Sequence, residues 1–161
     1  MRRILVGTLG CLLLAARPGI PQAAPTEAHV LLTPAEFKWG PTPPALPPGS
    51  TLVVLSGDPS QPGPFALRVR VPAGYRIPPH WHPTVEHLTI LSGNVAFGMG
   101  DTFDESTMKT LPAGGYAAMP AEMRHYLKAK TAAVFEVNAM GPFVLTYVNP
   151  KDDPRTAAPA K

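Results

Sequence analysis

The chain has 161 residues, which is enough for one domain with its own core but too few for two ordinary domains. It contains 22 Pro and 14 Gly, and only 16% of its residues are charged. Because its apolar residues fall in short runs between turn residues, the composition favours an all-β fold and argues against a helical or disordered chain.

Residues 1–24 have the layout of a secretory signal peptide. Arg2 and Arg3 give a positive start, residues 4–16 form an apolar run, and a stretch with Pro and Ala follows. The run is shorter than the roughly 20 residues that a membrane-spanning helix needs. We therefore expect cleavage and export to the periplasm or the exterior, without stable membrane insertion.

Cleavage would change the charge and the cysteine content of the protein. The formal net charge of +3 includes Arg2, Arg3 and Arg17, and their removal leaves 11 basic and 11 acidic residues. A balanced charge gives no support for a nucleic-acid partner. The only cysteine, Cys11, also lies in the removed segment, so the mature protein is expected to have no disulfide.

Residues 25–50 are rich in Pro, with Phe37 and Trp39 as isolated apolar side chains. This composition predicts an extended arm that packs either on the domain or on a second subunit of a homodimer. At the other end of the chain, residues 149–161 are expected to form a flexible tail.

Residues 51–148 are expected to form the domain, because strand-like segments follow one another at short intervals between turn residues. In residues 65–71 apolar and polar side chains alternate, which predicts a strand with one buried face. Ser92, Gly93 and Asn94 predict a hairpin turn between two neighbouring strands. The expected strands are 51–55, 65–71, 85–91, 95–99, 116–119, 125–129, 132–137 and 143–148.

The segment His80-Trp81-His82 carries the clearest chemical signal in the chain. Side chains two residues apart on a strand project from the same face, so the two imidazoles can converge on one metal ion. Glu86 has the same parity four residues later. A histidine pair of this kind is by itself more often a solvated or packed edge, so the interpretation depends on the surrounding sequence.

That surrounding sequence resembles the first conserved motif of the cupins. Five residues separate Gly74 from His80, three separate His82 from Glu86, and six separate Glu86 from Gly93. Every fixed position of the motif is matched.

The second cupin motif is matched in part, after a gap of 20 residues. Gly114 and Pro120 are separated by five residues, and His125 follows at the expected distance. Glu122 stands where the family usually has Gly, and Ala129 where it usually has Asn. These departures affect turn and packing positions and leave the histidine in place.

The resemblance is to small, single-domain cupins of type 2, and it covers roughly residues 51–148. It implies a double-stranded β-helix, or jelly-roll barrel, with one metal ion near one mouth. The ligands it implies are His80, His82, Glu86 and His125. Three neutral imidazoles and a carboxylate suit Mn, Fe, Ni, Co, Cu or Zn, and leave a coordination position open for a small-molecule ligand or substrate.

Other residues allow weaker metal hypotheses. Asp101, Asp104 and Glu105 could suggest calcium, but they lack the regular spacing of a calcium loop, so a solvated turn is favoured. Four methionines could suggest copper, although methionine commonly fills cores. His87 has the opposite parity to Glu86 and is expected to point away from the site. The methionines are Met99, Met119, Met123 and Met140.

The sequence leaves three functions open. The first is a metal-dependent enzyme, such as an oxygenase, decarboxylase or isomerase. The second is a non-catalytic module of the cell envelope that binds or senses a metal or a small ligand, because no acid or base besides Glu86 shares its face. The third is a structural metal that stabilises a dimer. The catalytic residues and the substrate stay open, since many functions share this scaffold.

Overall fold

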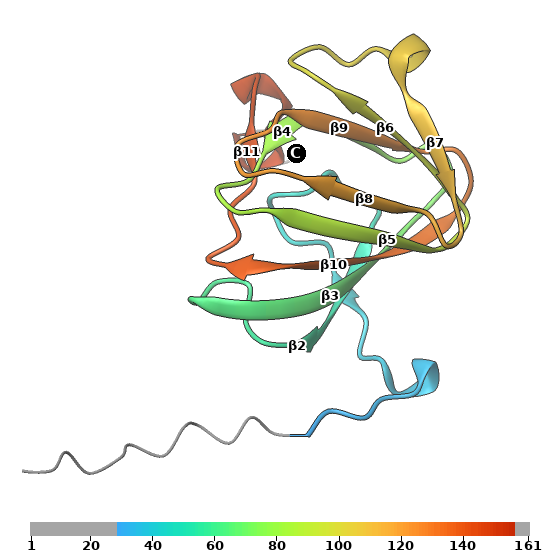
Figure 1. Ribbon diagram of the computed structural model, residues 1–161, viewed down its shortest axis with the longest axis vertical. Coiled ribbons are helices and arrows are strands. Elements are labelled where there is room, and N and C mark those ends of the chain that lie inside the picture. Colours follow the sequence, from blue (N-terminus) through green and yellow to red (C-terminus); the bar gives the residue numbers. More distant parts are fainter. Residues whose placement is uncertain (1–28, 157–161) are drawn as a thin grey trace, which may run out of the picture.

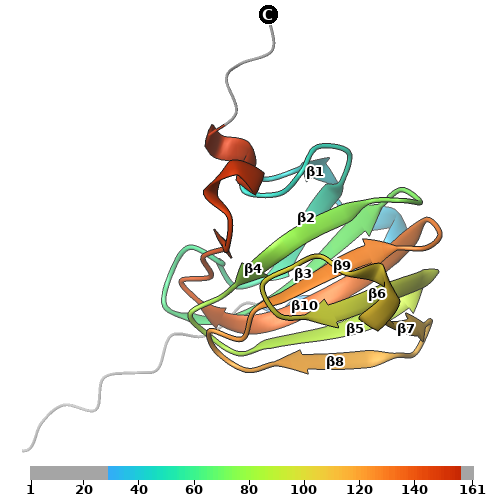
Figure 2. The ribbon, with the colours of Figure 1, turned by 90° about the horizontal axis from the view of Figure 1, so that it is seen from above.

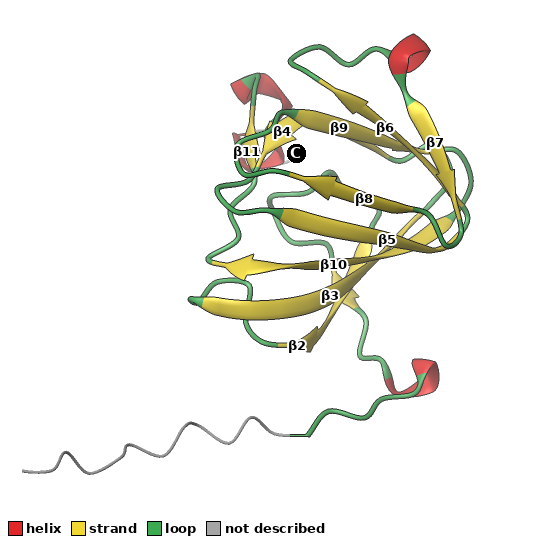
Figure 3. Cartoon of the chain, in the orientation of Figure 1, coloured by secondary structure: helices red, strands yellow, loops and turns green. Residues whose placement is uncertain are grey.

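The computed structural model describes residues 29–156, and this part of the chain folds into two antiparallel β-sheets that face each other (Figure 1, Figure 2). Strands and loops make up almost all of it, as Figure 3 shows. The strands are β1 (Gly40–Pro41), β2 (Thr51–Ser56), β3 (Gly63–Val71), β4 (Arg76–Trp81), β5 (Glu86–Ser92), β6 (Asn94–Met99), β7 (Lys109–Pro112), β8 (Tyr116–Met119), β9 (His125–Ala129), β10 (Ala133–Gly141) and β11 (Thr146–Tyr147).

The strand order is that of a jelly roll. One sheet has the order β1-β2-β3-β10-β5-β8, and the other has the order β11-β4-β9-β6-β7. Successive strands therefore often lie in different sheets, which is typical of the double-stranded β-helix. The all-β jelly-roll prediction is confirmed.

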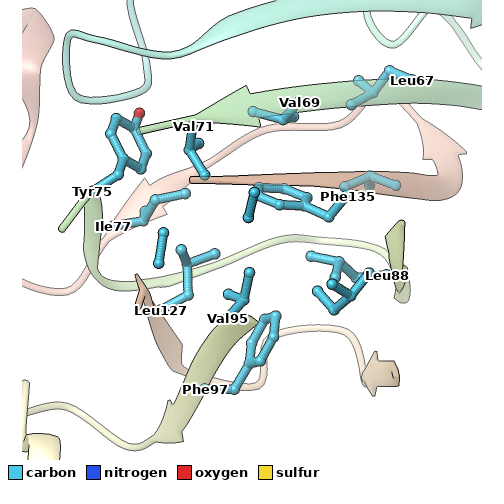
Figure 4. Close-up of a cluster of buried hydrophobic side chains, with 14 of the residues drawn as sticks. Leu67, Val69, Val71, Tyr75, Ile77, Leu88, Val95, Phe97, Leu127 and Phe135 are labelled. Carbon is cyan, nitrogen blue, oxygen red and sulfur yellow. The ribbon is translucent and has the colours of Figure 1, made fainter. Parts of the chain in front are cut away.

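The core lies between the two sheets and follows from the alternation of side chains along the strands. In β3, Phe65, Leu67, Val69 and Val71 are buried while the residues between them face outward. Figure 4 shows side chains of this strand and of Phe135 in β10 pointing toward side chains of the opposite sheet. Long pairings on both edges of β10, with β3 and with β5, hold the first sheet together.

The predicted arm packs on this chain's own domain. The guanidinium of Arg68 lies 4.9 Å from the centre of the Phe37 ring, and that of Arg70 lies 4.1 Å from the Trp39 ring. Arg68 and Arg70 point outward from β3, so the arm crosses the outer face of the first sheet. The homodimer stays a prediction, as do the boundaries assigned to the arm.

The next part of the arm, residues 42–50, forms a strap across one opening between the sheets. The Tyr75 hydroxyl donates to the carbonyl oxygen of Pro47 at 2.6 Å, and the Tyr147 hydroxyl donates to that of Ala45 at 2.9 Å. Leu46 packs against the core beneath it. Two buried tyrosines thus fix the strap in place.

The predicted hairpin at Ser92-Gly93-Asn94 is wrong. β5 pairs with β10 and β8, whereas β6 pairs with β7 and β9 in the other sheet, so the turn carries the chain across the core. Gly93 has a φ of +79°, and a Cβ on it would lie 2.3 Å from the carbonyl oxygen of Ala132. A tight corner and a hairpin need the same residue types, which explains the error.

The last part of the described chain is folded back onto the domain. Residues 150–156 contain two 3-10 turns, Pro150–Asp152 and Pro154–Thr156. Arg155 pairs with Asp153 and donates to the carbonyl oxygen of Leu145 at 3.0 Å. The predicted signal peptide and residues 157–161 lie outside the described residues. No helix within 29–156 is long and apolar enough to cross a membrane.

Candidate metal centre

Three strands bring the predicted ligands to one end of the space between the sheets. His80 lies near the end of β4 and pairs with His125, the first residue of β9. His82 follows β4 directly, and Glu86 begins β5 in the opposite sheet. All four side chains are buried, with exposed fractions between 2% and 6%. The site therefore joins the two sheets.

The three histidine rings converge. One ring nitrogen from each of His80, His82 and His125 lies within 4.8 Å of the other two. A carboxylate oxygen of Glu86 lies 3.3 Å from Nε2 of His125 and 3.7 Å from Nε2 of His82. The three histidines are close enough to hold a single ion, and the Glu86 carboxylate lies beside two of them.

Backbone carbonyls fix which nitrogen of each ring faces inward. Nδ1 of His80 lies 2.8 Å from the carbonyl oxygen of Pro78, and Nδ1 of His82 lies 2.9 Å from that of Val144. Nδ1 of His125 is 2.9 Å from the carbonyl oxygen of Met123. A carbonyl can only accept, so each Nδ1 donates its hydrogen and each Nε2 keeps a free lone pair.

The electrostatics of the site favour neutral imidazoles. Burial lowers the pKa of His80 well below its ordinary value, and the neighbouring His125 and His82 lower it further. Burial also lowers the pKa of His82, outweighing the opposite effect of the Glu86 carboxylate. Neutral imidazole is the form that binds metal.

These observations test whether a metal ion fits. The buried nitrogens face one another with lone pairs and no donor hydrogen between them, which is unfavourable unless a cation or a proton is shared. The three histidines can therefore hold a metal ion, and the backbone carbonyls behind them supply the orientation that metal-binding histidines usually need.

An apolar cavity of about 360 Å³ adjoins the histidines and extends between the sheets toward the strap. The strap, Val54 and the loop at residues 58–60 also line it, and of these Val54, Asp58 and Ser60 are exposed to solvent. The loop lies beside the histidines, because the N–H of Phe143, whose ring stacks on His82, donates to the carbonyl oxygen of Pro59 at 2.7 Å. The cavity makes the centre accessible to a small molecule.

One residue near the centre has no signal in the sequence. The Phe143 ring stacks on the His82 ring with their centres 4.1 Å apart and the planes 16° from parallel. Phe143 and Val144 follow β10, some sixty residues beyond His82 in the chain, so only the fold brings them together. They fix the plane of the His82 ring from two directions.

The two departures from the second cupin motif have a visible structural role. Glu122 adopts a φ of +63°, in the left-handed region that favours glycine, and its N–H donates to the carbonyl oxygen of His82 at 2.8 Å. The backbone of Ala129 exchanges hydrogen bonds with Gly74 and Tyr75. Glu122 shapes a turn next to the site, whereas Ala129 lies at the end of β9 away from His125, and neither contributes a side chain to the centre.

The weaker candidates lie elsewhere. His87 is exposed and contacts the Tyr116 hydroxyl at 2.6 Å, away from the centre. Asp104 caps a 3-10 turn and Glu105 pairs with Arg76 and Lys128, so these acidic side chains already have partners. Of the four methionines, Met119 is in the core and the other three are 40% to 52% exposed.

The metal-free protein is expected to lose stability as the pH falls below about 6.5. In the unfolded chain His80 and His82 take up protons near that pH, whereas the folded site holds their pKa values lower. The unfolded state then binds more protons, so the free energy of unfolding decreases on acidification toward the folded-state pKa values. Urea unfolding of chelator-treated protein between about pH 7.5 and about pH 5.5 measures this.

His87→Ala is the matched control variant, because it removes an exposed histidine outside the buried cluster. An unfolding free energy that stays constant or increases on acidification over this range would contradict the prediction.

The fold and the buried histidines define the chain as a single-domain cupin. Within that class it belongs to the ChrR cupin-like domain family, whose model matches residues 27–143. No curated protein matches the chain significantly.

Solved structures confirm the fold. The polyketide cyclase RemF from Streptomyces resistomycificus aligns at a TM-score of 0.66 and 16% identity, over 80% of this chain and 91% of the other. An RmlC-like cupin from Shewanella frigidimarina aligns at 0.56 and 13%, over 71% and 92%. The DMSP lyase DddQ from Ruegeria pomeroyi aligns at 0.57 and 22%, over 73% and 64%.

Proposed function

We propose that the mature protein is an exported cupin that binds one divalent transition-metal ion through His80, His82, Glu86 and His125. In this proposal the metal acts on a small molecule in the adjoining cavity. The convergence of three acceptor nitrogens on one buried point, beside the Glu86 carboxylate, carries the proposal. The apolar cavity that adjoins this point supports access by a substrate.

The protein's own residues would orient the ligands and shape the reaction space. Carbonyls of Pro78, Val144 and Met123 hold the three imidazoles in one tautomer. The apolar walls exclude water around a bound molecule, which strengthens electrostatic interactions inside. A bound ion would polarise an oxygen of the substrate or, if redox-active, support oxygen chemistry.

An oxygenase, a decarboxylase or an isomerase is the kind of enzyme we propose. Two of the similar structures, a polyketide cyclase and a DMSP lyase, are enzymes, so the fold is compatible with catalysis. One observation favours a non-catalytic binding or sensing module of the cell envelope instead. Apart from the four candidate ligands, the only acid that lines the described cavity is Asp58, which lies in an exposed loop.

Metal content and turnover together test the proposal. The mature protein is purified without chelators from the compartment to which it is exported, and its metals are measured by mass spectrometry. We expect about one equivalent of metal per chain. Iron or manganese together with oxygen consumption or decarboxylation supports the enzyme; zinc or copper with saturable ligand binding and no product supports the binding module. A wild-type protein that holds no metal even after reconstitution overturns the central proposal.

Export is tested on the same sample. The intact mass should correspond to a chain that begins near residue 25, after removal of the predicted signal peptide. A full-length chain found only in the cytoplasm would contradict export and leave the metal site unaffected.

A further inference from the structure

The walls of the cavity differ sharply from the part of its lining around the histidines. Apolar side chains of both sheets form the walls, and Figure 4 shows most of them pointing into the space between the ribbons. No Lys, Arg, Asn or Gln side chain lines the cavity among the described residues. Six wall residues are Leu67, Val69, Leu88, Leu127, Phe135 and Val137.

The polar side chains in the lining form two neighbouring groups. One is the three histidines with Glu86, and the other is Asp58 and Ser60 in the exposed loop beside them. Asp58 accepts hydrogen bonds from the Ser60 backbone at 2.8 Å and from its hydroxyl at 2.7 Å, which lower the pKa of its carboxyl group. This loop therefore carries a negative charge whose hydrogen bonds are already made within the loop.

The arm completes one side of the cavity wall. Pro43, Ala45 and Leu46 of the strap line the cavity, and all three are apolar. Because the Tyr75 and Tyr147 hydroxyls fasten the strap to the domain, this side of the cavity is fixed and does not offer a polar group to a ligand.

We propose that the cavity binds small molecules with one oxygen-containing head group and an otherwise hydrocarbon body, and that it excludes molecules with a second anionic group. This inference rests on the proposed function, because the head group is assigned to the metal at the three histidines. A second anionic group would lie against the apolar walls without a partner or face the Asp58 carboxylate, and both positions are unfavourable.

The expected change in binding affinity follows from the burial of the ligand's hydrocarbon chain. Each methylene group that enters the cavity should increase affinity about fourfold, as transfer from water to an apolar environment does. A second carboxylate should decrease affinity at least about 30-fold. Dicarboxylates and sugars are therefore excluded, while a monofunctional chain is accepted.

Calorimetry with matched straight-chain probes tests the inference on the metal-loaded protein. Butanoate, hexanoate and octanoate measure the dependence on chain length, and adipate adds a second carboxylate to hexanoate without lengthening the chain. We expect affinity to rise from butanoate to octanoate and adipate to bind at least about 30-fold more weakly than hexanoate. Equal binding of adipate and hexanoate, or no dependence on chain length, overturns the inference.

Variants of the cavity wall test whether the dependence of affinity on chain length arises in the cavity. Val137→Phe fills part of it and should remove the gain between hexanoate and octanoate, and Leu67→Ala enlarges it and should extend the gain to longer chains. Val134→Phe is the matched control, because Val134 lies on the same strand with its side chain on the outer face of the sheet. If the control changes the chain-length dependence as much as Val137→Phe does, the cavity is not where the chains bind.

Neutral probes separate this inference from the proposed function. The matching 1-alkanols need no metal, so in the metal-free protein they should show the same gain in affinity per methylene. If this gain is present but no metal binds, the proposed metal centre fails and the cavity inference stands. If metal binds but neither series depends on chain length, the cavity inference alone fails.

Discussion

Replacing His82 with alanine is expected to weaken metal binding by at least about 100-fold. Loss of a partner that only orients a metal ligand typically costs 10- to 100-fold, and loss of the ligand itself should cost at least as much. His82 is also fixed on two sides, by the Val144 carbonyl and by the Phe143 ring, so its ring is held in the orientation that a ligand needs. Titration of the chelator-treated protein, followed by mass spectrometry of the bound metal, measures the loss.

The matched control for this variant is His87→Ala. It removes a histidine five residues along the chain whose ring contacts Tyr116 outside the site, so it should retain wild-type metal affinity. A ligand that binds only the folded state also raises its stability. Metal should therefore increase the melting temperature of His87→Ala but not that of His82→Ala. If His82→Ala keeps wild-type metal affinity, His82 is not a ligand.

The strands that the sequence predicts well are those with a clear burial pattern. Alternating or continuous apolar residues place β3, β5, β6, β8 and β9 within one or two residues of their observed bounds. β4 has no such pattern, because Pro78 and Pro79 interrupt it. Its pairing with β9 is irregular between Ile77 and His80, where prolines cannot donate to the ladder. β7 is a short, polar edge strand and gives almost no sequence signal.

The candidate site was easier to predict than the pairing of the strands. His80, His82 and His125 converge and Glu86 lies beside them, as the resemblance to the cupin motifs implies. Spacing along one strand does not explain this, because Glu86 lies on β5 in the opposite sheet and His125 on β9. The contacts that hold these side chains in place could not be predicted in the same way. The stacking of Phe143 on His82 and the strap across the cavity depend on contacts between distant segments. Neither the residue types nor their spacing in the sequence predicts these contacts.

Replacing Gly98 with alanine is expected to destabilise the protein by about 3 kcal/mol, at the upper end of what overpacking usually costs. Gly98 in β6 lies opposite Tyr126 in β9, and a Cβ on it would lie 2.1 Å from the tyrosine ring. Tyr126 is buried between this strand and residues 103–107, with its ring 5.0 Å from that of Phe103 and its hydroxyl 3.0 Å from that of Thr107. The ring has no space to move without breaking these contacts.

Urea unfolding of Gly98→Ala and of a control glycine variant measures the effect. Gly40→Ala is the matched control, because a Cβ there would lie 3.7 Å from its nearest neighbour and its stability should change by less than about 0.5 kcal/mol. A double-mutant cycle identifies the cause. In a Tyr126→Leu background the clash with the ring is gone, so Gly98→Ala should cost much less there than in the wild type. An equal cost in both backgrounds would show that the tyrosine ring is not what requires glycine at this position.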